Sequence, residues 1–306
     1  MTAIAPALER ARPRAPWPVL AAIAAAWALA IVAESTGTAG ALHHDSLIEH
    51  GPPFWAALLL FLLAWQAMSQ VLDLDLLLPE PLTVLRNVVS TLTVSDPHWL
   101  YGPNIYVHLW HSFLRAMAGF VSAAVIAIPL GLALGRISWL REFLMPAVQG
   151  VYPIPGIAWI PLAILWFGLG DAAVVFVVFA TVFFPLLFNA EAGARLISPT
   201  VLDAGRCFGA RGVSFFFRIV LPATVPFIIT GLRISLGGAW RMIVAGEMLA
   251  SQDGIGYLLM ESRFQFRAVD LMTAMILVAI VGYATEKVIV GTIEKRTIEK
   301  WEVVSS

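Results

Sequence analysis

Charged side chains inside long apolar stretches are the residues of this chain whose chemistry is easiest to interpret. One such stretch, near residues 223–249, contains Arg233, Trp240, Arg241 and Glu247. A guanidinium in an apolar segment is costly, so it usually faces a partner or an aqueous cavity. Arg233 and Arg241 are therefore candidates to contact an anion in a pathway, with Trp240 shaping the cavity wall and Glu247 as a further candidate pathway residue. The alternatives are that Arg233 pairs with Glu247 or Glu191, or bonds carbonyls at a helix break, and that Trp240 and Arg241 only pack.

No combination of residues predicts catalysis. Ser112, Ser122 and Ser138 have no His and acidic residue predicted within a shared aqueous pocket, so a nucleophilic site is not expected. All lysines lie in the last twenty residues, and none follows a glycine. A phosphate-binding P-loop needs a Gly-Lys pair, so the chain is not expected to be an ATPase by itself. Any ATP hydrolysis that it uses must come from a partner.

Metal ions and nucleic acid are also not expected to bind. Cys207 is the single cysteine, and no His or Cys group has the spacing of a structural zinc site. His43, His44 and His50 are interpreted as residues of a short polar loop. The net charge of −1 provides no basic field for nucleic acid.

The composition indicates whether the chain is surrounded by water or by lipid. Its 306 residues are 59% hydrophobic and 13% charged, whereas a soluble protein carries roughly 45–50% apolar and about 25% charged residues. A globule of this size has too little interior for so much apolar surface, and a chain in lipid has no such limit. An ordinary soluble enzyme is therefore excluded, and the prediction is an integral membrane protein.

Continuous apolar runs predict an all-α protein, because about 20 helical residues cross a bilayer and none of the runs alternates like a membrane strand. The predicted spans are approximately Trp17–Ala33, Phe54–Leu72, Phe113–Leu134, Phe143–Phe167, Ala172–Ala194, Ala223–Leu249 and Ala268–Val290. Prolines and glycines near 153–161 predict that the fourth is kinked or broken. A mildly amphipathic helix is expected at Leu82–Leu92. The fold class is a six-helix core with an extra N-terminal hydrophobic helix.

The placement of Arg and Lys predicts the orientation, because cytoplasmic loops are enriched in both. The basic segments are Gly135–Glu142, Arg195–Leu221 and the C-terminal tail, and the loops between them hold few basic residues. These segments and the C-terminus are therefore expected in the cytoplasm. A seventh crossing at Trp17–Ala33 would place Arg10, Arg12 and Arg14 outside, and a cleaved signal peptide would invert the rest. The favoured interpretation is an accessory helix of unresolved topology.

The longest predicted cytoplasmic loop has the pattern of a helical hairpin. It runs from Asp203 to Pro222 and reads DAGRCFGARGVSFFFRIVLP. A short helix is expected to about Phe208, with Asp203 in its first turn. Gly209 and Gly212 allow a sharp reversal that a β-carbon would resist, before an aromatic helix at Val213–Val220.

This loop resembles the EAA loop of permease subunits of ATP-binding-cassette (ABC) importers. That motif is E-A-A, three residues, G, nine residues, I, one residue, L-P, and this chain matches every spacing with Asp203-Ala204-Gly205, Gly209, Ile219 and Leu221-Pro222. Asp203 replaces Glu and Gly205 replaces the second Ala. The resemblance implies that the 203–222 loop couples the chain to an ATPase. The implied coupling residues are Asp203, Ala204, Gly205, Arg206, Gly209, Arg211 and Gly212.

Four further segments narrow the resemblance to the nitrate, sulfonate, taurine and bicarbonate group of these permeases. They are HLWHSFLRAMAGFVSAAVIAIPLGLALG, IPGIAWIPLAILWFGLGD, FFPLLFNAEAG, and LPATVPFIITGLRISLGGAWRMIVAGEML followed by GIGYLL. The predicted organisation is an N-terminal extension at 1–53, a first core span and external loop at 54–112, and a permease core at 106–301.

The resemblance also implies partners and a mechanism. The chain would form a permease homodimer in a bacterial inner membrane, with a cytoplasmic ATPase dimer that binds ATP and Mg, and a periplasmic or lipid-tethered binding protein. No cofactor is expected on the chain itself. It would import a small anion or oxyanion by alternating access. The rival hypotheses are an ion-coupled secondary transporter, which needs buried acidic relays, and a membrane-embedded enzyme.

Overall fold

The structure is a computed structural model that describes residues 52–72, 78–93 and 105–297. The accessory helix predicted at Trp17–Ala33 and the histidines at 43, 44 and 50 lie outside the described residues. The chain divides into two compact units, Met1–Arg86 and Asn87–Ser306. The second unit contains the predicted coupling loop at 203–222 and the predicted pathway residues.

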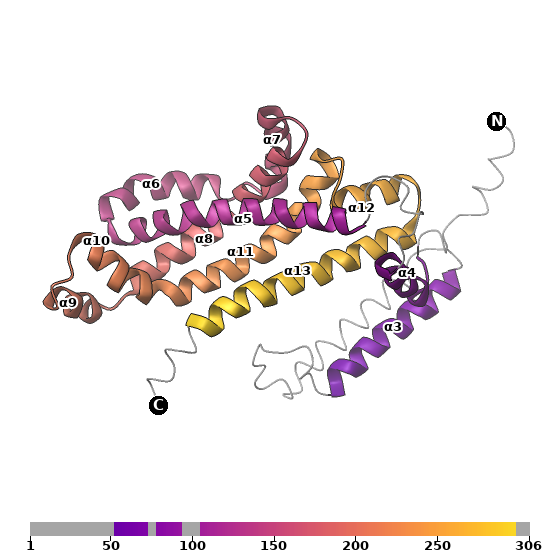
Figure 1. Cartoon of the computed structure of the whole chain (residues 1–306), viewed down its shortest axis with the longest axis horizontal. Helices are drawn as coiled ribbons and strands as arrows, with labels where there is room; N and C mark the ends of the chain where they lie inside the picture. The colour runs from indigo at the N-terminus through magenta and orange to yellow at the C-terminus, as the bar shows by residue number, and fades with distance from the viewer. Residues whose placement is uncertain (1–51, 73–77, 94–104, 298–306) are drawn as a thin grey trace. The chain divides into compact units, whose positions relative to one another are not determined.

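The described residues form helices and turns without a strand, which confirms the all-α prediction (Figure 1). In the first unit α3 covers Pro52–Leu72, and α4, Pro81–Thr93, begins there and ends in the second. The second unit continues with α5 (Ile105–Arg136), α6 (Ser138–Val151), η1 (Gly156–Trp159), α7 (Ile160–Phe167) and α8 (Asp171–Leu196). It then contains α9 (Pro199–Cys207), α10 (Gly212–Phe215), η2 (Phe216–Val220), α11 (Leu221–Ala250), α12 (Ile255–Phe264) and α13 (Ala268–Thr297).

Four helical segments of the described chain are long and apolar enough to cross a membrane: Ile105–Arg136, Asp171–Leu196, Gly212–Ala250 and Ala268–Thr292. The fourth predicted span is broken, as expected, into Ser138–Val151 and Gly156–Phe167, which meet at 90°. The break follows from Pro153 and Pro155, which cannot donate the helical hydrogen bonds. α3 contains a shorter apolar helix, Leu59–Val71.

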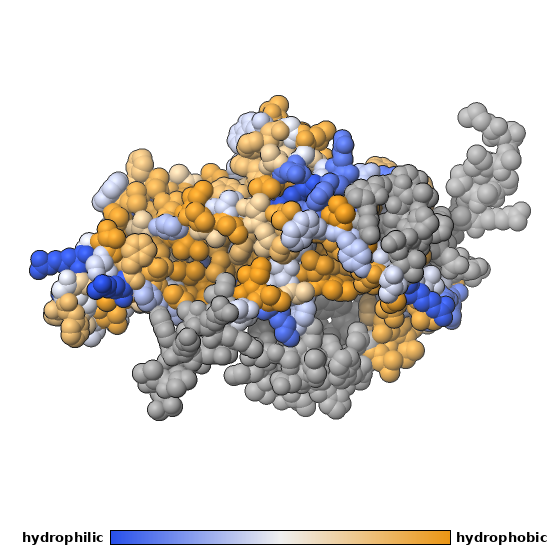
Figure 2. Space-filling model, viewed as in Figure 1, coloured by the Kyte–Doolittle hydropathy of each residue, from blue (hydrophilic) through white to orange (hydrophobic). Residues whose placement is uncertain are grey.

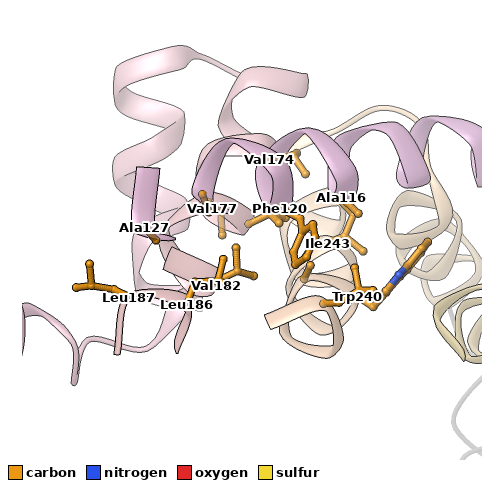
Figure 3. Close-up of a cluster of buried hydrophobic side chains, with 14 of the residues drawn as sticks. Ala116, Phe120, Ala127, Val174, Val177, Val182, Leu186, Leu187, Trp240 and Ile243 are labelled. Carbon is orange, nitrogen blue, oxygen red and sulfur yellow. The ribbon is translucent and has the colours of Figure 1, made fainter. Parts of the chain in front are cut away.

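The core of the second unit lies where α5, α8 and α11 meet (Figure 3). Phe120 of α5, Val182 of α8 and Trp240 of α11 are among its buried residues. Large apolar side chains also cover the outside: Leu165 is 78% exposed and Phe143 is 74% exposed. Figure 2 shows hydrophobic residues over most of the visible face of the helices, with strongly hydrophilic residues at the end that carries α9. This distribution fits a bundle surrounded by lipid.

Close approach of α5 and α8 depends on small residues. A β-carbon added at Gly119 would lie 2.7 Å from Cβ of Val178 and 2.8 Å from the carbonyl oxygen of Val175. Neither atom is the end of a flexible side chain, so the helices would have to move apart. Small residues serve the same purpose in membrane helix pairs generally.

Gly119→Ala is therefore expected to lower the free energy of unfolding by about 1–3 kcal/mol, the usual cost of overpacking. Gly150→Ala is the matched control, because a β-carbon at Gly150 of α6 meets no atom within 4 Å. Gly150→Ala should be as stable as the wild type or slightly more stable, since alanine favours the helix more than glycine does. Unfolding of the detergent-solubilised protein in denaturant measures both. Equal stability of the two variants would contradict the close contact.

Candidate functional site

The loop between α8 and α11 forms the helical hairpin that the sequence predicts, but α9 begins at Pro199, so the predicted position of Asp203 in the first helical turn is wrong. α9 begins after Ser198, whose side chain accepts a hydrogen bond from the N–H of Val201 at 3.3 Å. α9 ends at Cys207, and α10 follows after a short turn. The next segment, η2, is a π-helix that runs directly into α11. A short turn joins α9 to the continuous helical segment Gly212–Ala250, which includes the membrane-spanning helix α11. A movement of α9 can therefore be transmitted to α11.

Glycines make the reversal between α9 and α10. Gly209 has a φ of +81° and Gly212 a φ of +54°, both in the left-handed region. The N–H of Gly209 donates to the carbonyl of Arg206, and that of Ala210 donates to Gly205. This bond pair is the Schellman arrangement that ends helices at a left-handed glycine. The predicted sharp reversal is confirmed.

Gly205 replaces the Ala that the motif has at its third position, and the packing of this chain leaves little room for a β-carbon there. It is buried against Ile219, and an added β-carbon would lie 2.8 Å from Cγ1 of that side chain. Both are motif positions, so two parts of the sequence pattern meet in space. A buried cluster extends from this contact: it contains Leu202 of α9, Val220 of η2 and Ala194 of α8.

The opposite face of α9 is exposed. Asp203 accepts a hydrogen bond from Arg206 at 3.0 Å, and the Arg206 guanidinium lies 5.6 Å from the ring centroid of Phe215. Ala204 and Arg211 are also exposed. Phe208 is 91% exposed, which is an unusual position for an aromatic side chain. Asp203, Ala204, Arg206, Phe208 and Arg211, together called the α9 surface, thus expose one aromatic ring together with charged groups.

The four residues predicted for a pathway all lie on α11 but in different surroundings. Trp240 is 5% exposed and packs beside Gly282 of α13, so it is a core residue of the described chain. Arg233 is half-buried, and Arg241 is exposed within the membrane-spanning segment. Glu247 is completely buried.

The two carboxylates considered as partners of Arg233 are bonded to other arginines. Arg115 donates to Glu247 at 2.9 Å, and Arg195 donates to Glu191 at 3.2 Å. The ion pairs described for these two carboxylates are thus with other arginines, and the suggested pairing of Arg233 with either glutamate stays a prediction.

A buried polar cluster centred on Arg115 lies at the end of the bundle opposite α9. Besides Glu247, Arg115 donates to Asp171 at the start of α8, at 2.7 Å, and to the side chain and carbonyl of Asp253. Its own side chain is 6% exposed. One guanidinium therefore connects α5, α8, α11 and the turn before α12.

The start of α12 completes this cluster. The N–H of Gly256 donates to Glu247 at 3.0 Å, and Ser112 of α5 donates to the same carboxylate at 2.7 and 2.8 Å. The N–H of Gly254 donates to Nδ1 of His108 at 2.9 Å. Negative charge at a helix N-terminus is stabilised by the unpaired N–H groups and the helix dipole. Glu247 is thus a structural anchor of this end of the bundle.

Sequence reasoning missed most of this cluster. Arg115 lies inside a predicted span, so the rule that singled out Arg233 and Arg241 applied to it equally. Ser112 was judged to lack an acidic partner, yet Glu247 lies beside it. His111 pairs with Asp253 at 2.7 Å. The contacts of His108, His111, Ser112 and Arg115 with residues 247–254 span 132 to 146 positions, and Asp171 is 56 positions from Arg115, so only the fold brings these partners together.

Asp253 gives this cluster a pH dependence. Burial alone would raise the pKa of Asp253, but hydrogen bonds from Arg115 and His111 hold it below its ordinary value of 3.8. A carboxylate with a lowered pKa stabilises the folded state above its ordinary pKa, and this contribution is lost as pH falls through the lowered value. Asp253→Asn is expected to be less stable than the wild type by about 1–3 kcal/mol at pH 7. In thermal unfolding, the stability difference between Asp253→Asn and the wild type should narrow below about pH 4. A difference that stays constant with pH would contradict the lowered pKa of Asp253.

Comparisons with known proteins agree with this structure. Residues 127–298 match the family model described as the inner membrane component of binding-protein-dependent transport systems. The taurine transport system permease protein TauC of Escherichia coli K12 is 31% identical over 223 residues, which are 72% of this chain and 80% of the relative. The nitrate import permease protein NrtB of Synechocystis is 30% identical over 236 residues, 76% of this chain and 84% of the relative. A relative from Methanocaldococcus jannaschii is 35% identical over 177 residues, 58% of this chain and 66% of the relative.

The apolar helices and the hairpin between α8 and α11 thus define a multi-pass membrane transport subunit. The chain belongs to the inner-membrane-component family of binding-protein-dependent transport systems, the permease subunits of ABC importers.

Proposed function

We propose that the chain forms the translocation pathway of an ATP-driven importer for a small anion or oxyanion of the nitrate, sulfonate, taurine or bicarbonate class. The relatives named for taurine and nitrate transport support this substrate class. A separate ATPase supplies the energy by docking on the α9 surface. The chain itself has no catalytic role in this proposal, and ATP and Mg bind to the ATPase.

The main support for the proposal is the exposed α9 surface, which belongs to a hairpin that packs against two membrane-spanning helices. Phe208 and Val213 are 91% and 73% exposed, although both are apolar. The other side of the hairpin is buried: Leu202 and Val220 pack in one cluster with Ala190 of α8 and Ile228 of α11. A push on α9 is thereby transmitted to two membrane-spanning helices, which is what alternating access driven from outside the membrane requires.

The proposed assembly follows the family. Two copies of the chain pair, each docking one ATPase subunit, and a periplasmic or lipid-tethered binding protein delivers the substrate at the opposite side. The α9 surface and the C-terminus face the cytoplasm. The basic residues near the α9 end, among them Arg136, Arg141 and Arg195, support this orientation.

Arg241 is the proposed pathway residue with the strongest structural support. Its side chain is exposed within the segment Gly212–Ala250, where an arginine facing lipid would be costly. A water-filled pathway lined by this face of α11 avoids that cost and places a positive charge where an anion passes. Arg233, eight positions earlier on α11, lies roughly 12 Å from Arg241 along the helix axis, towards the N-terminal end of α11. Glu247 is completely buried, which favours a supporting role over direct contact with the substrate.

Transport assays test the proposal. The chain is reconstituted in liposomes with its genomically neighbouring ATPase and binding protein, and uptake of labelled taurine, nitrate, bicarbonate and an alkanesulfonate is measured. ATP-dependent uptake of at least one of these anions is expected, together with its loss when the ATPase is inactivated. Uptake driven by an ion gradient without the ATPase would instead establish a secondary transporter and overturn the proposal.

A further inference from the structure

A groove between α6 and α8 lies at the end of the bundle that carries α9. Its volume is about 360 Å³, and both helices contribute charged and apolar residues to its lining. They include Arg141, Glu142 and Met145 of α6, and Phe188, Glu191 and Arg195 of α8. No residue of α6 is fully buried, although Leu140, Leu144, Met145 and Val148 are partly buried against the main core. The side of α6 that lines the groove is thus accessible to a ligand.

The charged end of the groove is built around Glu191. This carboxylate is 7% exposed, and its Oε1 lies 3.2 Å from Arg195 and 3.7 Å from Arg141. The side chains of Arg195 and Arg141 are 53% and 36% exposed. A guanidinium has five N–H donors, so one shared carboxylate oxygen leaves donors on both arginines for a second acceptor. Two guanidinium groups that flank one opening fit a phosphate, which both can bind through paired hydrogen bonds.

On both helices, the charged residues of the groove lie nearest the end that carries α9, and the apolar residues lie further from that end. On α8, Arg195 lies in the last turn, Glu191 one turn earlier and Phe188 one turn earlier again. On α6, Arg141 lies near the start and Met145 one turn further from that end. Both helices thus present charged groups near the membrane surface and apolar groups further in. A phospholipid has this order, with its phosphate at the surface and its acyl chains below.

We propose that this groove binds a phospholipid whose headgroup carries a phosphate and an ammonium group, as in phosphatidylethanolamine. The phosphate lies between Arg141 and Arg195, the ammonium group meets Glu142, and an acyl chain passes Met145 and Phe188. The apolar half of the groove favours a lipid over a small soluble anion, which would leave it empty. The presence of Glu142 beside the two arginines favours a zwitterionic headgroup over an anionic one. The site does not depend on the transported substrate, and the bound lipid would contact both α6 and α8.

Lipid retention tests the site. The full-length wild-type chain, washed in detergent, is expected to keep about one phosphatidylethanolamine per chain by native mass spectrometry. Arg141→Gln/Arg195→Gln is expected to retain at least ten-fold less. Arg211→Gln/Arg218→Gln is the matched control, because both arginines lie in the same basic region outside the groove, and it should retain as much as the wild type. Glu142→Gln should shift retention several-fold towards phosphatidylglycerol.

Cross-linking gives a result that does not depend on the variants folding. Wild-type protein in phosphatidylethanolamine vesicles is labelled with a phosphatidylethanolamine that carries a photoreactive acyl chain. Labelling at Met145 and Phe188 should exceed that at Leu165 and Trp166, which are exposed on α7. Uniform labelling would identify ordinary surrounding lipid and overturn the proposal. Equal retention by the two double variants, or displacement of the lipid by inorganic phosphate or taurine alone, would also overturn it.

Discussion

Replacing Arg115 by methionine is expected to destabilise the folded chain by about 3–5 kcal/mol, the usual cost of removing one partner from a buried ion pair. The guanidinium is 6% exposed and is hydrogen-bonded to Glu247, Asp171 and Asp253. Without it, Glu247 remains a completely buried carboxylate that has lost its positive partner. Low yield and a large fall in the thermal unfolding midpoint of the detergent-solubilised protein are the expected observations.

Two variants separate this effect from a general loss of charge. Arg263→Met is the matched control, because Arg263 is exposed near the end of α12 and, among the described residues, its side chain contacts the neighbouring Phe264 ring and Met260. It should change stability by less than about 0.5 kcal/mol. Arg115→Met/Glu247→Leu should recover part of the loss, since it removes both buried charges together. If Arg115→Met were as stable as Arg263→Met, the cluster would not be what holds these helices together.

Phe208→Ala is expected to weaken binding of the partner ATPase about 30-fold, because an aromatic anchor at the centre of an interface typically contributes about 2 kcal/mol or more. Phe208 is 91% exposed, so truncating it costs the isolated chain almost no packing. Stability should remain that of the wild type while affinity for the ATPase falls. Titration of the purified ATPase into reconstituted permease, followed by fluorescence, measures the affinity.

Phe264→Ala provides the comparison for that experiment. Phe264 is also strongly exposed, at 66%, but it lies on α12 at the opposite end of the bundle from α9. Its truncation should leave ATPase affinity unchanged. If both variants bound the ATPase as the wild type does, the α9 surface would not be the docking site.

Much of the fold could be predicted because it depends on local composition. Continuous apolar runs set the positions of α5, α8, α11 and α13, with ends that shift by several residues where polar positions such as His108 continue a helix. The hairpin was predicted from two glycines, and Gly209 and Gly212 do adopt the left-handed backbone that the pattern requires. The broken span was predicted from prolines, although its angle depends on how η1 and α7 pack against α8.

The polar cluster could not be predicted with the same information. Its members come from α5, α8, α11 and the turn before α12, and their pairing depends on how these helices cross. Glu247 was assigned to a pathway because sequence alone cannot tell a buried acid with a partner from one that faces water. The existence of an intramembrane Arg115 was visible in the sequence, but its three carboxylate partners were not.

The central claim, that a separate ATPase drives this chain through α9, can be tested at Cys207. Cys207 is exposed on α9 and is the single cysteine of the chain. A photoreactive cross-linker attached to it in membrane vesicles containing the ATPase should form an adduct with the ATPase, with a yield that changes when ATP is added. The control is Cys207→Ser/Phe264→Cys, which moves the probe to α12 and should give no such adduct. An absence of adduct from Cys207, or equal adducts from both positions, would contradict the account.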